Sequence, residues 1–210
     1  LRTLDWYKKT FEQFRTEIRT FGNFPSMFLG LVTPTRDGET AAAFEYCDGV
    51  LRVVDQTGKI VQDQVDPARY AGFIGEAVEP WSYLKFPYLK QVGWQGFVDG
   101  MESGVYKATP LSRLNAADGM ATPLAQAEYE KFYETLGGKP VNPTLATHWA
   151  RLIELTYATE NWVRLATDPE ITGKEYRKLP TETPTEGVGC VEAPRGTLTH
   201  HYATDERGIL

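Results

Sequence analysis

The segment Glu192-Ala193-Pro194-Arg195-Gly196 is the part of this sequence best suited to chemistry, because its neighbours constrain the backbone that carries one cation. Pro194 fixes its own φ and favours an extended conformation in the residue before it. Gly196 permits a backbone conformation that other residues rarely adopt. We therefore expect Arg195 to project from a stiff turn. Its planar, permanently charged guanidinium suits it to hold an anionic ligand in a fixed orientation.

Two interpretations of Arg195 remain open from the residues themselves. The guanidinium could hold an anionic ligand, or it could pair with a nearby carboxylate such as that of Glu192. Surface ion pairs of the second kind are common and need no ligand. The two interpretations differ in where Glu192 lies relative to Arg195.

The three histidines are the side chains whose ordinary pKa lies closest to neutral. His200 and His201 follow the turn, and alternation along a strand sends their side chains to opposite faces. We expect His201 at the surface or at a subunit contact. His148 stands at the start of a long apolar segment, where a packed or capping role is the simplest interpretation.

The two cysteines, Cys47 and Cys190, lie far apart in the sequence and outside any Cys-x-x-Cys pair. A disulfide framework, a zinc site or an iron-sulfur site needs several closely spaced ligands. We therefore predict no metal ligand in this chain. Each cysteine is expected to be a buried structural thiol.

Composition excludes several classes of function. The net charge is -6 and the sequence pI is about 5.2, without a run of Lys and Arg that could neutralise a line of phosphates, so nucleic acid is excluded as a partner. No apolar stretch reaches the length of a membrane helix, and the first residues lack the layout of a signal peptide. We expect a cytoplasmic protein without a membrane span.

The pattern of apolar residues predicts an α+β fold, mainly α with a smaller β part. A helix is expected at about 4–21, where apolar residues recur at steps of three and four. Two more are expected at about 123–136 and 143–167, the second of them long and buried because it carries apolar residues on more than one face. A β-containing lobe with a β-hairpin and short strands is expected at about 41–110, and a strand-turn-strand unit at 187–202. Asp66-Pro67 predicts the start of a short helix that runs to about Val78.

The ends of the chain suggest a piece of a larger protein. The chain begins at Leu1 without an initiator Met and stops at Ile209-Leu210, two apolar residues after a glycine. Both ends are expected to be cut. We therefore treat 1–210 as a single segment of a larger subunit.

A family resemblance extends over nearly all of the sequence. The run GVGCVEAPRGTLTHHY at 187–202 resembles the Glu-Ala-Pro-Arg-Gly segment of nickel-iron hydrogenase large subunits. Four further segments are similar to the bidirectional, NAD-reducing branch of that family: FGNFPSMFLGLV at 21–32, GEAVEPWSYLKFPYL at 75–89, TPLSRLN at 109–115 with ATPLA at 121–125, and HWARLIELTYATENW at 148–162.

This resemblance implies a function for the complete protein. It would be the catalytic large subunit of a hydrogenase, which oxidises H2 reversibly to protons and electrons. Its expected partners are a flavin-containing module that reduces NAD and an iron-sulfur small subunit. A nickel-iron cluster with CN and CO ligands is implied for the complete subunit. Its two Cys-x-x-Cys pairs are missing from this chain, so the piece alone is expected to be inactive.

The resemblance also implies roles for individual residues. Arg195 is expected to lie over the open side of the cluster as the catalytic residue, with Ala193 and Pro194 beside the diatomic ligands. Glu192 and His200 are expected in or near the cluster pocket. Two alternatives remain: a metal-free relative in the quinone-site subunit of respiratory complex I, and a non-catalytic assembly piece. The Thr-Leu-Thr-His-His sequel at 197–201 favours the hydrogenase.

Overall fold

The computed structural model describes residues 2–35, 41–179 and 181–210. The helices are α1 (Arg2–Gln13), α2 (Arg15–Thr20), the short 3-10 helix η1 (Pro67–Arg69), α3 (Tyr70–Phe73), α4 (Pro110–Ala116), α5 (Pro123–Leu136) and α6 (Ala146–Ala166). The strands are β1 (Met27–Val32), β2 (Val50–Val54), β3 (Ile60–Val65), β4 (Ile74–Val78), β5 (Lys85–Leu89), β6 (Tyr106–Lys107), β7 (Glu186–Glu192) and β8 (Thr197–Ala203).

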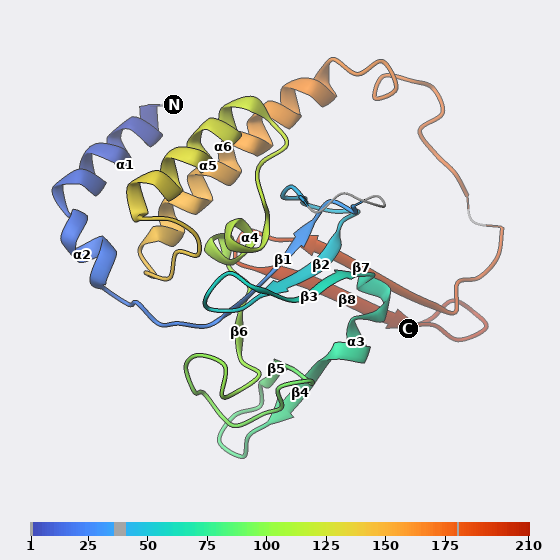
Figure 1. Cartoon of the computed structure of the whole chain (residues 1–210). Coiled ribbons are helices and arrows are strands. Elements are labelled where there is room, and N and C mark those ends of the chain that lie inside the picture. The colour runs from blue at the N-terminus through green and yellow to red at the C-terminus, as the bar shows by residue number, and fades with distance from the viewer. Residues whose placement is uncertain (1, 36–40, 180) are drawn as a thin grey trace.

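A four-stranded sheet with the order β3-β2-β1-β6 lies at the centre of the chain (Figure 1). Strand β1 is antiparallel to β2 and parallel to the short β6. Every residue of β1 is buried, which indicates that both faces of the sheet are covered at this strand. Met27, Leu29 and Leu31 belong to the apolar cluster on one face, whereas Val32 belongs to the cluster on the other.

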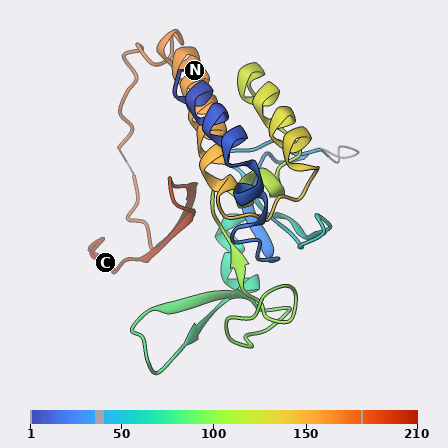
Figure 2. The ribbon, with the colours of Figure 1, turned by 90° about the vertical axis from the view of Figure 1, so that its left-hand side faces the viewer.

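The larger cluster lies between the sheet and the helices. Helix α4, all of whose residues are buried, packs on β1, and α5 and α6 pack beyond it. Figure 2 shows α1, α5 and α6 gathered on the side of the sheet opposite the β4–β5 hairpin. Aromatic rings of three helices meet in the cluster, where Trp149 has ring contacts with Phe11 and Phe132. Helix α4 is thus held between the sheet and the long helices.

The smaller cluster covers the opposite face of the sheet. It includes Leu51, Val53 and Leu89, and Cys190 of the β7–β8 hairpin packs against it. The β4–β5 hairpin forms a separate two-stranded sheet that projects from the body of the chain (Figure 2). The strands of the predicted lobe 41–110 therefore divide between two sheets.

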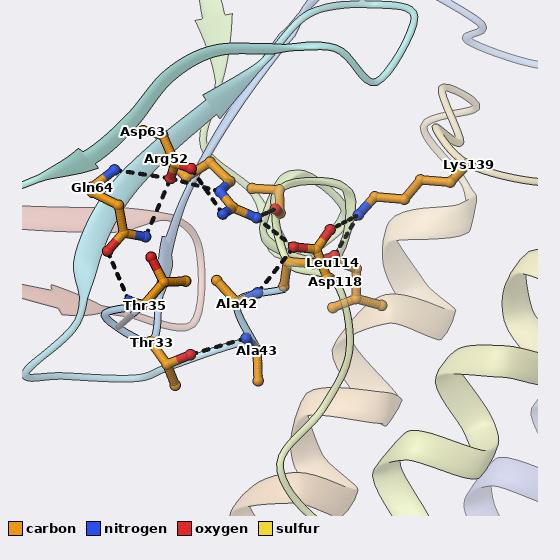
Figure 3. Close-up of polar contacts among 12 residues, drawn as sticks. Thr33, Thr35, Ala42, Ala43, Arg52, Asp63, Gln64, Leu114, Asp118 and Lys139 are labelled. Atoms are coloured by element: carbon orange, nitrogen blue, oxygen red, sulfur yellow. Dashed lines mark hydrogen bonds and ion pairs between the residues drawn. The ribbon is translucent and has the colours of Figure 1, made fainter. Parts of the chain in front are cut away.

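One buried cation ties the sheet to the segment between α4 and α5. Arg52 of β2 makes two hydrogen bonds to Asp63 of β3, at 2.8 and 2.9 Å, and one to Asp118 at 2.6 Å. Figure 3 shows Asp118 between Arg52 and Lys139, where it also accepts a hydrogen bond from the Ala42 N–H at 3.0 Å. A buried guanidinium needs such partners, because an unpaired charge in the interior costs several kcal/mol.

The predicted α+β class is confirmed, and the expected β-hairpin is the pair β2–β3. The first helix differs from prediction: it is two helices, α1 and α2, with a break at Phe14, whose φ and ψ are -110° and 31°. The helix predicted to reach Val78 ends at Phe73, and β4 follows because residues 74–78 pair with β5. Asp66 accepts a hydrogen bond from the Ala68 N–H, as a helix cap does.

The long helix α6 is buried only along part of its length. Its buried residues lie between Ala146 and Tyr157, whereas Trp162 and Val163 are exposed. Among the described residues, no helix has the length and apolar character needed to cross a bilayer.

Candidate functional site

The turn that carries Arg195 joins β7 to β8. The two strands are paired up to Glu192 and Thr197, and the Ala193 N–H donates a hydrogen bond to the Gly196 carbonyl at 3.1 Å. We predicted that Gly196 adopts a backbone conformation that other residues rarely adopt. This prediction is wrong, because Gly196 does not have a positive φ. A Cβ at position 196 would lie 2.3 Å from the Ala108 carbonyl oxygen, so glycine is required by close approach to the segment before α4.

Two guanidiniums hold the backbone of the turn. Arg113 of α4 donates a hydrogen bond to the Ala193 carbonyl oxygen, and Arg151 of α6 donates one to the Pro194 carbonyl oxygen. The side chain of Arg113 has no exposed surface. Because these are consecutive carbonyls directly before Arg195, the two cations fix the backbone from which Arg195 projects.

The Glu192 carboxylate is the buried partner of Arg113. Glu192 Oε2 lies 3.3 Å from Arg113 Nη1 and accepts a hydrogen bond from Thr197 Oγ1 at 2.9 Å. Glu192 Oε1 accepts a hydrogen bond from the Leu31 N–H at 2.6 Å. The Leu31 N–H lies on the edge of β1 beyond the end of β6, so this carboxylate completes the hydrogen bonding of the edge. Burial raises the pKa of Glu192, while Arg113, the Leu31 N–H and Thr197 oppose the rise.

The predicted alternative in which Arg195 pairs with Glu192 is therefore wrong. Glu192 contacts Arg113, a residue whose sequence position suggests no relation to the turn. Arg195 itself is exposed and has no hydrogen bond or ion pair with any other residue that the structure describes. Its guanidinium is available to a group outside this chain.

A second buried carboxylate, Glu154 of α6, completes the cluster around Arg113. Glu154 Oε1 lies 3.2 Å from Arg113 Nε. Both atoms, together with Arg113 Nη1, are buried and lack a hydrogen bond, so these contacts are between charges without hydrogen-bond geometry. The Tyr46 hydroxyl donates a hydrogen bond to the Glu154 backbone oxygen at 2.7 Å. Burial raises the pKa of Glu154 to about 8; Arg113 opposes this rise, Glu192 adds to it and Arg151 opposes it.

A cavity of about 220 Å³ lies beside these charges. Both carboxylates and both clamping guanidiniums contribute to its wall. The complete lining is Tyr46, Arg113, Arg151, Glu154, Leu155, Ala158, Glu192, Ala193 and Pro194. The turn before Arg195 is thus one wall of a small cavity to which four charged side chains contribute.

Of the predicted site residues, the structure brings together Glu192, Ala193 and Pro194 but not His200. His200 is exposed on β8, contacts the Tyr202 hydroxyl and lines a different cavity on the hairpin. His201 lies 2.6 Å from Glu186 Oε1 and 3.1 Å from the Tyr70 hydroxyl.

Sequence reasoning missed Arg113, Arg151 and Glu154. One signal for Glu154 was available, because it falls within the helical stripe that α6 buries, which also contains Ile153 and Tyr157. A carboxylate in such a stripe requires a buried partner. Arg113 is similarly placed between the buried Leu111 and Leu114.

The cysteines do not form a metal site. Both are free; Cys190 is half-buried and Cys47 is exposed, contrary to the prediction that both thiols are buried. Within the ranges 2–35, 41–179 and 181–210, no group of three or more His, Cys, Asp or Glu side chains could hold a metal ion. An iron-sulfur cluster usually takes four cysteine ligands, so these residues do not fit one.

Comparisons with known proteins give related sequences and a related structure. No protein-family model matches the chain. It is 45% identical over 172 residues, or 82% of its length, to a protein of Archaeoglobus profundus named as an iron-sulfur subunit of F420-non-reducing hydrogenase. It is 39% identical over 201 residues, or 95% of its length, to the NAD-reducing hydrogenase HoxS subunit beta of Cupriavidus necator.

A solved structure described as an NAD+-reducing [NiFe]-hydrogenase in the H2-reduced state superposes with a TM-score of 0.85 and 34% identity, covering 99% of this chain. The chain spans only part of each of these proteins: 35% of the Archaeoglobus protein, 38% of the Cupriavidus protein and 43% of the chain in the solved structure.

The name of the Archaeoglobus relative contradicts the prediction of a nickel-iron large subunit. That relative is named an iron-sulfur subunit, and neither named relative is called a large subunit. The predicted assignment to the catalytic large subunit, with nickel binding and a nickel-iron cluster carrying CN and CO ligands, is therefore wrong. The chain also lacks the thiolate ligands that such a cluster would need, since it contains two cysteines and no Cys-x-x-Cys pair.

Proposed function

We propose that this chain is a segment of a hydrogenase subunit whose turn 192–196 presents Arg195 as a fixed cation to the reaction that the complete complex performs. That reaction is the oxidation of H2 to two protons and two electrons, with the electrons passed to an acceptor such as NAD through partner subunits. Similarity to hydrogenase subunits over most or nearly all of the chain supports the assignment to such a complex.

The observation that carries this proposal is the clamp on the turn. Arg113 and Arg151 hold the two carbonyls that precede Arg195, and Gly196 packs against Ala108 without room for a side chain. A backbone held in this way positions its side chain before the reaction begins, so little reorganisation is required when charge develops.

The chemical role of Arg195 follows from its charge. A guanidinium stabilises negative charge by electrostatic attraction and by directed N–H donors, and it stays protonated throughout. Arg195 is therefore given an electrostatic role, whereas a role as proton acceptor would require an Arg pKa far from its ordinary value.

The test uses the complete complex carrying Arg195→Ala or Arg195→Lys, with H2-dependent reduction of NAD or of a dye as the readout. Removing one preorganised donor of this kind costs about 100-fold or more in rate. We expect that loss for alanine and a smaller loss for lysine, which keeps the charge but not the planar fork. Arg177→Ala is the matched control, because Arg177 is exposed in the connection between α6 and β7.

Two results would overturn the proposal. A wild-type complex without H2-dependent reduction would remove the assignment to a hydrogenase. Equal rates for the alanine variants at positions 195 and 177 would remove the role of Arg195.

A further inference from the structure

We propose that Glu154 is a proton-relay residue, which accepts protons from water in the cavity behind the turn and returns them to it. The inference rests on the proposed function, because H2 oxidation releases one proton for every electron that leaves. Each relay step is a simple exchange: hydronium gives a proton to the Glu154 carboxylate, forming water and a neutral carboxyl, and the reverse step restores both.

The charges around the cavity disfavour ionisation of both buried carboxyls at once, so one of the two is expected to hold a proton. Two carboxylates, Glu154 and Glu192, share the single fully buried guanidinium of Arg113. Arg151 reaches the rim of the cavity, where its donor is directed to the Pro194 carbonyl. Two buried negative charges around one buried positive charge disfavour full ionisation, as in carboxylate pairs that share a site.

Hydrogen bonding decides which carboxyl takes that proton. Glu192 accepts two hydrogen bonds, from the Leu31 N–H and from Thr197, and these stabilise its anionic form. In the described part of the chain no group donates a hydrogen bond to the Glu154 carboxyl, and its Oε1 is buried. Glu154 is therefore the carboxyl that alternates between the neutral and the charged state.

Charged side chains face Glu154 from α4, from β7 and from its own helix. Arg113 faces it from α4, Glu192 from β7 and Arg151 from its own helix α6, while Tyr46 binds its backbone oxygen from the segment before β2. Burial, the largest influence, raises the pKa of Glu154 to about 8. A group with a pKa near the working pH exchanges protons most effectively in both directions.

The cavity supplies the route. Its volume of about 220 Å³ is enough for several water molecules, each of which occupies about 30 Å³ of the liquid. Glu154 contributes to the cavity wall, and its side chain keeps 6% of its surface exposed although its Oε1 is buried. Ala193 and Pro194 form another part of the wall and lead directly to Arg195, so the relay would connect with the region behind the proposed reaction site.

The test compares Glu154→Gln, Glu154→Asp and Glu134→Gln in the complete complex. Glutamine keeps the shape of the side chain but cannot take up the proton, whereas aspartate keeps a carboxyl. Glu134 is exposed on α5 and provides the same chemical change away from the cavity. The rate of H2-dependent reduction is measured as a function of pH for each protein.

We expect the wild-type rate to rise as Glu154 loses its proton near pH 8. Glu154→Gln should lower the rate by about 100-fold, the smaller end of the effect of a positioned acid or base, and should abolish this rise. Glu154→Asp should restore part of the rate with a shifted midpoint, and Glu134→Gln should match wild type. A purely structural role would not move the pH midpoint.

Infrared difference spectroscopy separates this inference from the proposed function. A band of a protonated carboxyl should titrate near pH 8 in wild type and be absent from Glu154→Gln. An inactive wild-type complex would refute the hydrogenase assignment, while the band would still decide whether Glu154 exchanges protons. The relay is overturned if the glutamine variant keeps the wild-type pH profile or, should that variant fail to fold, if Glu154→Asp leaves both midpoint and band unchanged.

Discussion

At the scale of single residues, two fully buried arginines are central to the structure. Arg52 and Arg113 each face two carboxylates, but their surroundings differ. Arg52 makes hydrogen bonds with good geometry to Asp63 and Asp118, whereas the contacts of Arg113 with its carboxylates lack that geometry. A fully satisfied polar network makes one arrangement rigid, whereas buried polar atoms without hydrogen bonds are costly. The first is a structural contact, and the second belongs to the proposed relay.

The Arg52 network has a pH dependence of definite sign. Burial acts to raise the pKa of Asp63, but the hydrogen bonds and charge of Arg52 outweigh it, so the pKa falls below 3.8. A carboxyl whose pKa is lower in the folded state contributes stability above its unfolded pKa and loses that contribution as the pH falls through its folded pKa. We expect Asp63→Asn to lower the free energy of unfolding at neutral pH, with a difference from wild type that shrinks below pH 3.8.

The measurement is chemical denaturation over a range of pH. Glu182→Gln, an exposed carboxylate-to-amide change between α6 and β7, is the control and should follow wild type throughout. A difference for Asp63→Asn that stays constant with pH would contradict the explanation.

At the scale of elements, the contact between β1 and α4 determines the position of the site. Gly30 of β1 lies beneath α4, where a Cβ would be 2.9 Å from Arg113 Cα and 3.3 Å from Ala116 Cβ. Only a strand without a side chain at this point lets α4 approach closely enough for Arg113 to reach the turn after β7. Helix α4 thus carries the Arg113 cation, and the close approach of β1 to α4 determines how far Arg113 lies from the turn after β7.

We therefore expect Gly30→Ala to destabilise the protein, because backbone atoms of α4 must move away from the sheet. Overpacking of this kind costs about 1–3 kcal/mol. It should also reduce H2-dependent reduction, since Arg113 moves with its helix. Gly72→Ala is the control: no atom lies within 4 Å of the Cβ it would add. Thermal unfolding and activity of both variants test this, and equal behaviour would contradict the proposed contact.

At the scale of the whole molecule, the two apolar clusters on opposite faces of the central sheet contribute unequally. The cluster beneath the helices contains most of the buried aromatic rings, including Phe132 and Trp149, which meet edge to face. The opposite cluster is smaller, and its fully buried members are Met, Leu and Val side chains. Beyond it, Trp81 of the β4–β5 hairpin and Phe97 of the segment after β5 are exposed. The stability of the described chain therefore depends mainly on the helical side.

Phe132→Ala should lower the free energy of unfolding by about 3–5 kcal/mol, through lost burial and the cavity that remains. Leu124→Ala on the same helix removes a side chain that is 53% exposed and should change it by about 0.5 kcal/mol or less. Denaturant titration of the complete protein provides both values. Similar losses for the two variants would mean that the helical cluster does not dominate stability.

The sequence by itself determined local features of the backbone, namely turns and hairpins. Pro194 and the strand pattern on both sides predicted a turn that displays Arg195, and two β-rich runs separated by a short turn segment predicted the hairpin β2–β3. These features depend on backbone preferences over a few residues, which sequence contains directly. The strand β4 was missed because its pairing with β5 overrides the local preferences there, and the structure offers no packing reason for the break at Phe14.

Only the tertiary structure decided which charges meet. Glu192 accepts from Leu31, 161 positions away, and Arg113 donates to Ala193, 80 positions away. The energy of a buried charge depends on its partners and on its exclusion from water, and both are properties of the folded chain. The turn and its cation were therefore readable in advance, whereas the clamp, the cavity and the buried carboxyl of Glu154 exist only once the strand, the helices and the hairpin have packed together.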